Sequence, residues 1–196
     1  MRIVGLLLAA GSATRFGSDK LRHELPHGVS IAVQAARHLK MELPDVIAVV
    51  RPGATELISS LKSEGCEVVI CDNAAEGMGA SLACAARAAA HLHPGADGVL
   101  VALGDMPFVR RTTIAAVRDA LAGGAALAAP YFRARRGHPV ALSKAFYKDL
   151  STLRGDEGAK KIIAQNERRL VKVPVGDPGT IRDIDTPGDL APPLRI

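Results

Sequence analysis

The sequence predicts a single three-layer α/β domain with a mostly parallel sheet, and three observations support this fold class. Short apolar, β-branched runs recur along the 196 residues, and stretches with helical spacing lie between them. Such alternation is typical of right-handed βαβ units, whose helices cover both faces of the sheet. No internal repeat, low-complexity tract or linker divides the chain. We therefore expect one domain over residues 1–190 and a short tail at 191–196.

The strands are expected in the apolar runs. These runs are IVGLLLA from Ile3, VIAVV from Val46, EVVI from Glu67, GVLVAL from Gly98 and ALAAP from Ala126. Runs of this length that are rich in Val, Ile and Leu are typical of strands buried on both faces. Ligands of open α/β sheets bind beyond the carboxyl ends of the strands, so the loops that follow these runs are the expected location of a site.

The helices are expected between the runs, where apolar residues recur at the spacing of one helical face. The stripes are Ile31, Ala35 and Leu39; Leu57, Ile58 and Leu61; and Ile114, Val117 and Leu121. A further helix is expected to begin in the stretch EGMGASL, at Glu76 to Leu82, and to run to His91.

Composition narrows the class of ligand. The formal net charge of +5 favours an anionic partner. Nucleic acid is disfavoured, because there are two Tyr, four Phe and no Trp, and none is interleaved with basic residues as a stacking platform would be. No apolar run approaches the roughly 20 residues of a membrane span. The three cysteines lack a C-x-x-C spacing, which favours a reducing cytoplasm over a disulfide framework or a zinc ribbon.

The loop after the first strand, LAAGSATRFGSDKL at Leu8–Leu21, predicts a phosphate cradle. Its small residues let backbone N–H groups close on phosphate oxygens, while Arg15 and Lys20 supply charge at two points. It is neither a Walker A loop, because five residues separate Gly11 from Gly17, nor a dinucleotide fingerprint, because Ala13 stands at the second glycine position. A strand-to-helix turn with solvated basic residues is the alternative.

Two acidic motifs predict a metal site beside this loop. Asp105, in GDMPF, follows the strand GVLVAL and should emerge at its carboxyl end. Asp183 and Asp185, in DIDTPGDL, alternate in extended chain and should point the same way, so that one of them can join Asp105 in holding Mg²⁺ against a triphosphate. The alternatives are a Gly-Asp turn closed by proline and a helix capped by Thr186.

The stretch EGMGASL places free N–H groups and Ser81 at a helix N-terminus, where they could bind a base or ribose; an ordinary helix start is the alternative. Further along, FRARRGHPV combines Arg133 and Arg136 with His138 and Pro139. Charges of this kind suit a phosphorylated acceptor, although a solvated basic loop is the more usual meaning of such a run.

One zinc-protease pattern, H-E-x-x-H at His23–His27, is rejected. The pattern requires both histidines on one helical face, and Pro26 breaks the turn that would align them.

Six ordered motifs resemble the molybdenum cofactor nucleotidyltransferases, whose opening loop reads L-A-[AG]-G, then R-[FM]-G and a lysine. Besides this loop they are EGMGASL, GDMPF, GHPV (Gly137 to Val140), GDEGAK (Gly155 to Lys160) and DIDTPGDL, so the resemblance covers almost the whole chain. It implies a Rossmann-like domain of the nucleotide-diphospho-sugar transferase type. It also implies transfer of CMP from CTP to molybdopterin, with Mg²⁺ as cofactor and a molybdenum hydroxylase as recipient of the product.

The resemblance also implies roles for individual residues. Arg15, Lys20 and Asp105 would be catalytic, and Asp105 and Asp185 would hold the metal. The nucleotide would contact Leu8, Ala9, Ala10, Gly11, Arg15, Lys20, Gly77, Met78, Ser81 and Asp105, and the acceptor would contact Arg133, Arg136, His138 and Pro139. Cytidylyl-transferring members carry alanine where Ala10 stands and guanylyl-transferring members carry glycine, which favours CTP. A guanylyltransferase, a cytidylyltransferase for a sugar or polyol phosphate and a non-catalytic delivery protein are the alternatives.

The chain departs from this family in two places. LRHELPHGVSIAV replaces the usual apolar turn after the lysine, and Lys160 stands where an arginine is common. The nucleotide side of the site is therefore better supported than the acceptor side.

Overall fold

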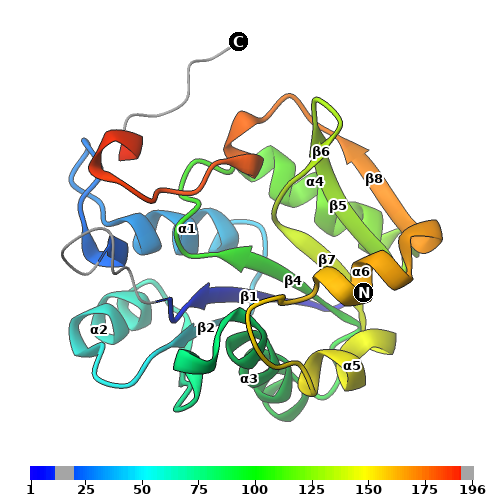
Figure 1. Cartoon of the computed structure of the whole chain (residues 1–196), viewed down its shortest axis with the longest axis horizontal. Coiled ribbons are helices and arrows are strands. Elements are labelled where there is room, and N and C mark those ends of the chain that lie inside the picture. Colours follow the sequence, from blue (N-terminus) through cyan, green and yellow to red (C-terminus); the bar gives the residue numbers. More distant parts are fainter. Residues whose placement is uncertain (12–19, 191–196) are drawn as a thin grey trace.

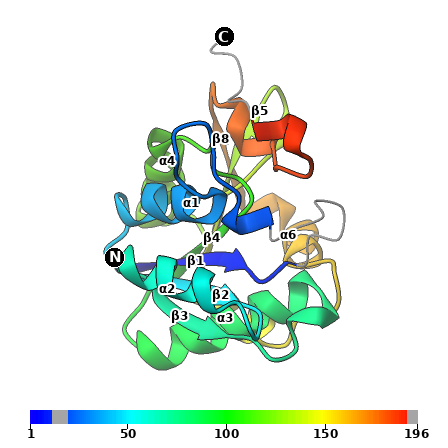
Figure 2. The same cartoon turned by 90° about the vertical axis from the view of Figure 1, so that its left-hand side faces the viewer.

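The computed structural model describes residues 1–11 and 20–190 and shows a twisted sheet between two layers of helices (Figures 1 and 2). The predicted catalytic Arg15 lies outside the described residues. The strands are β1 (Ile3–Ala9), β2 (Val46–Val50), β3 (Glu67–Ile70), β4 (Gly98–Leu103), β5 (Leu127–Phe132), β6 (Arg135–Arg136), β7 (Val140–Ser143) and β8 (Leu170–Pro174). The helices are α1 (Ile31–Lys40), α2 (Thr55–Ser63), α3 (Met78–Leu92), α4 (Arg111–Ala122), α5 (Tyr147–Ser151) and α6 (Lys160–Gln165).

The strands pair in the order β3-β2-β1-β4-β7-β5-β6, and β8 pairs with β5. β1 lies at the centre between β2 and β4 and is parallel to both, with Leu6 opposite Ile47 on one side and Val101 on the other. β7 runs antiparallel between β4 and β5. The predicted fold class, a single α/β domain with a mostly parallel sheet, is confirmed.

Alternate residues of the strands supply two separate cores. Leu7 packs into a core with α1, α2 and α4, whereas its neighbour Leu6 packs into a core with α3, α5 and α6. Figure 2 shows α1 and α4 above the sheet and α3 below it. Both residues are fully buried, because successive side chains of a central strand point to opposite faces and both faces are covered.

The five predicted strands all form, and the last begins one residue later than expected and extends to Phe132. The antiparallel β6 and β7 were not predicted. They arise because Arg133 and Ala134 adopt positive φ angles of 47° and 63° and reverse the chain, a conformation that neither residue type signals.

Two short segments that carry sequence motifs, residues 23–27 and 186–190, do not form α-helices. His23 and His27 do not lie on a helix. Residues 25–28 form a turn, in which Gly28 N donates to Leu25 O, and Glu24 pairs with Ser30 in an antiparallel bridge, so the histidines do not share a helical face. Pro187–Leu190 is a 3₁₀ helix that begins directly after Thr186, and the Asp189 carboxylate accepts from the Thr186 N–H at 2.9 Å and from its hydroxyl at 2.7 Å. Within the described ranges, no helix combines the length and apolar character needed to cross a membrane.

Candidate nucleotide-binding site

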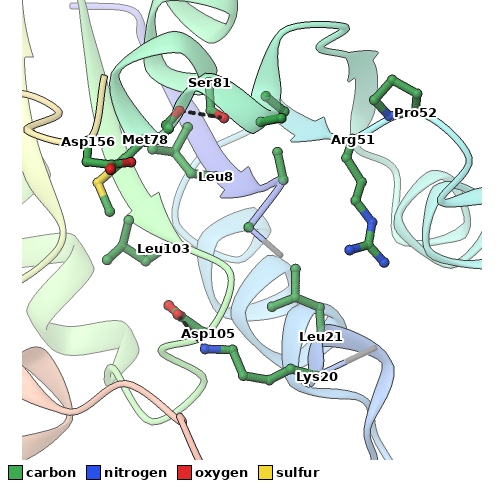
Figure 3. Close-up of a pocket in the computed structure, with 15 residues that line it drawn as sticks. Leu8, Lys20, Leu21, Arg51, Pro52, Met78, Ser81, Leu103, Asp105 and Asp156 are labelled. Atoms are coloured by element: carbon green, nitrogen blue, oxygen red, sulfur yellow. Dashed lines mark hydrogen bonds and ion pairs between the residues drawn. The ribbon is translucent and has the colours of Figure 1, made fainter. Parts of the chain in front are cut away.

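A cavity of about 560 Å³ lies beyond the carboxyl ends of β1, β2 and β4. Figure 3 shows Lys20 and Asp105 on one side of it and Ser81 and Asp156 on the other. It is lined by Leu8, Ala10, Gly11, Lys20, Leu21, Arg51, Pro52, Ala74, Ala75, Gly77, Met78, Ser81, Leu103, Asp105 and Asp156. Its size falls in the range of small-molecule sites, roughly 300–1,000 Å³.

The end of β1 forms the floor of this cavity. Leu8, Ala10 and Gly11 line it, whereas Ala9 packs into the core beneath α1. Gly104 brings the end of β4 against this floor, because its N–H donates to Leu8 O at 2.8 Å and a Cβ at Gly104 would lie only 3.0 Å from the same oxygen. The close approach places Asp105, the next residue, at the rim of the cavity.

Three carboxylates and one lysine meet at this rim. Lys20 Nζ lies 3.0 Å from Asp105 Oδ2 and 3.1 Å from Asp185 Oδ1. One carboxylate oxygen from each of Asp105, Asp183 and Asp185 lies within 4.8 Å of the others. The C-terminal segment is held here because Ile184 N donates to Asp105 O at 2.9 Å. The structure thus brings together residues more than 160 positions apart in the chain, Lys20 and Asp185 among them.

The electrostatics of the rim favour a protonated lysine. Burial of the Lys20 side chain, which is 11% exposed, lowers the pKa of the ammonium. The charges of Asp105 and Asp185 and the hydrogen bonds to them outweigh this effect and raise the pKa of Lys20 above its ordinary value. The lysine therefore carries a positive charge near pH 7.

The N-terminus of α3 forms the opposite wall. Met78 is 40% exposed there and Ser81 is nearly buried, with its hydroxyl donating to Gly77 O at 3.4 Å. The turn of GDEGAK packs directly against this helix end, because Gly79 N donates to Gly155 O at 2.6 Å. This contact makes Asp156 part of the wall.

Several residues of the cavity wall were not predicted from the sequence. Arg51 directly follows the predicted strand VIAVV, and its position at a carboxyl strand end was the signal that could have found it. Asp156 lay inside a recognised motif but had no assigned role. Pro52, Ala74 and Ala75 carry no chemical signal of their own.

The predicted acceptor residues, all within the described part of the chain, do not line this cavity. Arg133 and Arg136 are exposed on the β5–β6 hairpin, where Arg133 lies 5.2 Å from the centre of the Phe132 ring. His138 and Pro139 border a much smaller cavity that they share with Met106. Burial of the His138 ring lowers its pKa to about 4, so the ring is neutral near pH 7.

A cavity at the carboxyl edge of a mostly parallel sheet, with a lysine and carboxylates on its rim, defines an α/β protein of the nucleotide-binding class. The chain belongs to the MobA-like NTP transferase domain family, which it matches over residues 5–170. It is thus a nucleotidyltransferase of that family, and the resemblance found in its motifs is confirmed at this level.

The chain is similar to curated and solved proteins over nearly all of its length. It is 28% identical over 193 residues to nicotine blue oxidoreductase of Paenarthrobacter nicotinovorans, covering 94% of this chain and 92% of that one. It has the same identity and coverage with the purine catabolism protein PucB of Bacillus subtilis strain 168. The crystal structure of Rv0371c from Mycobacterium tuberculosis H37Rv has a TM-score of 0.83 at 24% identity, covering 96% of both chains, and shares the fold.

Proposed function

We propose that the protein transfers CMP from CTP to molybdopterin and releases pyrophosphate. The observation that carries the proposal is the meeting of Lys20, Asp105 and Asp185 at the rim of the cavity beside the end of β1. Carboxylates and a lysine at the carboxyl edge of a parallel sheet are the groups that a metal-bound triphosphate requires.

The donor set of the rim fits a hard divalent cation. Asp105 and Asp185, with Asp183 beside them, offer only carboxylate oxygens, which are the ligands that Mg²⁺ prefers. When bound, Mg²⁺ would neutralise charge on the phosphate oxygens. A structure of Rv0371c with manganese shows that a protein of this fold has been crystallised with a divalent cation.

The reaction needs no covalent intermediate with the protein. An oxygen of the acceptor phosphate forms a bond to the α-phosphorus, and the bond from that phosphorus to the bridging oxygen breaks, with its electron pair leaving on pyrophosphate. Lys20 would hold the triphosphate and stabilise the negative charge that develops on the leaving pyrophosphate. Arg15 is proposed to assist it. The remaining contribution of the chain is positioning, by the floor of Leu8, Ala10 and Gly11.

The choice of CTP is supported by Ala10, which is buried and lines the cavity. Its methyl group fills space that a purine would need. Gly77, Met78 and Ser81 on the facing wall would contact the base or ribose.

The acceptor is the less supported side of the proposal. Molybdopterin follows from the motif resemblance. The proposed roles of Arg133, Arg136, His138 and Pro139 rest on the basic run that they share and on the family motif GHPV, since the described cavity wall does not include them. The two curated relatives are named for an oxidoreductase and for purine catabolism, so their names do not point to one acceptor. The three cysteines are free thiols, which suits the proposed cytoplasmic location.

Pyrophosphate release tests the proposal directly. Each of the four nucleoside triphosphates is incubated with Mg²⁺, molybdopterin and the protein, and pyrophosphate is measured against a control without acceptor. CTP with molybdopterin should give acceptor-dependent release. If GTP were the one nucleotide that gave acceptor-dependent release, guanylyl transfer would be favoured. If release occurred only with a polyol phosphate in place of molybdopterin, the polyol phosphate would be the acceptor. Tight CTP binding without release under any condition would support the non-catalytic delivery protein, which would pass the cofactor to a molybdenum hydroxylase.

A further inference from the structure

Lys20 occupies the position that a metal ion would need. Its Nζ is held between Asp105 Oδ2 and Asp185 Oδ1 at 3.0 and 3.1 Å, and the Asp183 carboxylate lies beside them. The two carboxylates assigned to the metal are therefore already paired with the residue assigned to the triphosphate, whose single positive charge offsets one of their two negative charges.

The two cations exclude each other. Mg²⁺ binds carboxylate oxygens at about 2.0–2.1 Å, so an ion held by Asp105 and Asp185 would lie within a few ångströms of the present Nζ position. The Lys20 side chain is 11% exposed and that of Asp105 is 27% exposed, whereas that of Asp185 is 53% exposed, so solvent screens the Lys20–Asp105 pair less than the Lys20–Asp185 pair. A divalent cation that binds Asp105 Oδ2 and Asp185 Oδ1 would therefore have to displace the ammonium from these oxygens.

The backbone of Lys20 stays in place while its side chain can move. His23 N donates to Lys20 O at 3.1 Å, and Leu21 is buried in the core, so these contacts hold the backbone of the 3₁₀ turn Lys20–Arg22. The ammonium sits on a flexible four-carbon stem at the wall of the cavity, so rotation of that stem can carry it to phosphates bound there.

We infer that Lys20 is an exchangeable counter-ion, which bridges Asp105 and Asp185 in the free protein and moves to the triphosphate when a metal displaces it. The inference rests on the proposed function and adds a consequence to it. A metal alone must displace the lysine without a new partner for the ammonium, whereas a metal–nucleotide complex supplies that partner. Metal and nucleotide therefore bind with positive coupling that passes through one side chain.

Binding of Mn²⁺ alone tests the exchange, with the free ion measured by electron paramagnetic resonance. Lys20→Met removes the ammonium and keeps most of the stem, so it should bind Mn²⁺ at least tenfold more tightly than the wild type. Lys62→Met is the matched control, because Lys62 is an exposed residue of α2, and it should leave the affinity unchanged. Equal or weaker binding by Lys20→Met would overturn the exchange.

A second readout needs no variant and so survives a folding defect in Lys20→Met. Lysine acylation by a small activated ester is quantified by mass spectrometry in the wild type, with and without saturating Mn²⁺. Labelling of Lys20 should rise several-fold with Mn²⁺ while that of the exposed Lys62 stays constant. Unchanged labelling of Lys20 with Mn²⁺ bound would contradict the exchange.

The two proposals fail in distinguishable ways. If only the exchange proposal were wrong, the wild type would bind Mn²⁺ and release pyrophosphate with CTP. Lys20→Met would then bind Mn²⁺ with the same affinity as the wild type. Absence of Mn²⁺ binding by both wild type and Lys20→Met, even with CTP, would overturn the metal site and the exchange together.

Discussion

Ile184 N donates a hydrogen bond of 2.9 Å to Asp105 O, which ties the segment before the 3₁₀ turn Pro187–Leu190 to the loop that follows β4. The bond fixes the separation between Asp105 and the flanking Asp183 and Asp185, because Ile184 lies between them in sequence and its side chain is fully buried. The acidic rim is thus a rigid junction of two distant segments, and changes to either should be measurable in the site.

Asp105→Asn should fold normally but lose most turnover. The amide keeps the shape of the carboxylate and removes the charge that holds Mg²⁺, an effect worth several kcal/mol, so pyrophosphate release should fall by a hundredfold or more. Asp149→Asn, at an exposed position of α5, is the control. Unchanged release at saturating Mg²⁺ would remove Asp105 from the metal site.

Ala10 should set the preference for cytosine. Overlap of its methyl group with a purine would cost about 1–3 kcal/mol in a packed site. This is roughly a 5- to 150-fold preference for CTP. With Mg²⁺ and CTP at about 100 times Kd, the melting temperature should rise by roughly 5–10 °C. GTP at the same concentration should raise it less.

Ala10→Gly should narrow the difference between CTP and GTP by admitting the larger base. UTP serves as the matched control, because a second pyrimidine should respond little to the added space. A larger shift with GTP than with CTP in the wild type would rule out the cytidylyl assignment while leaving nucleotidyl transfer intact.

Gly79→Ala should destabilise the fold although alanine favours helices. A Cβ at this first-turn position of α3 would lie 2.5 Å from Arg154 O and 2.7 Å from Gly155 O, so the GDEGAK turn must move. We expect a loss of about 1–3 kcal/mol in the free energy of unfolding, measured with urea. Gly95→Ala is the control, because a Cβ there meets nothing within 4 Å. If Gly79→Ala and Gly95→Ala had equal free energies of unfolding, the GDEGAK turn would move to accommodate the new Cβ without destabilising the fold.

His138 should make the protein sensitive to mild acid. Burial lowers its pKa in the folded protein to about 4, below the ordinary value of 6.5, so the unfolded chain binds more protons between these two pH values. The contribution of the neutral His138 ring to the free energy of unfolding is therefore complete above pH 6.5 and is lost as the pH falls toward 4. The loss attributable to His138 should reach at most about 1.4 kcal/mol per pH unit in this window.

His138→Leu should flatten this pH dependence, measured as the difference in urea unfolding free energy between wild type and variant at pH 7 and pH 5. His38 has a lowered pKa as well, chiefly from burial, but it is present in both proteins and cancels in the difference. A pH dependence identical in the two proteins would show that His138 does not titrate with unfolding.

The candidate site was only partly predictable. Asp105 is predicted from its place directly after a buried strand, Lys20 from its place in a loop of small residues, and Asp185 from the resemblance. The structure brings the three together. Arg133 and Arg136 were chosen by charge and lie on a hairpin away from the cavity. Charge marks a residue as polar, but its distance from a site depends on the path of the chain. Their roles and those of the other site residues stay predictions.

The sequence by itself determined the fold class and the family. The apolar runs of β1 and β4 and the stripes of α1 and α4 are local patterns, which specify strands and helices because burial follows periodicity. Only the tertiary structure decided that β7 inserts antiparallel between β4 and β5, that Asp156 reaches the cavity wall, and that Lys20 already fills the space between Asp105 and Asp185. These are contacts between distant segments, and no local pattern records them because packing and charge pairing are settled only when the segments meet.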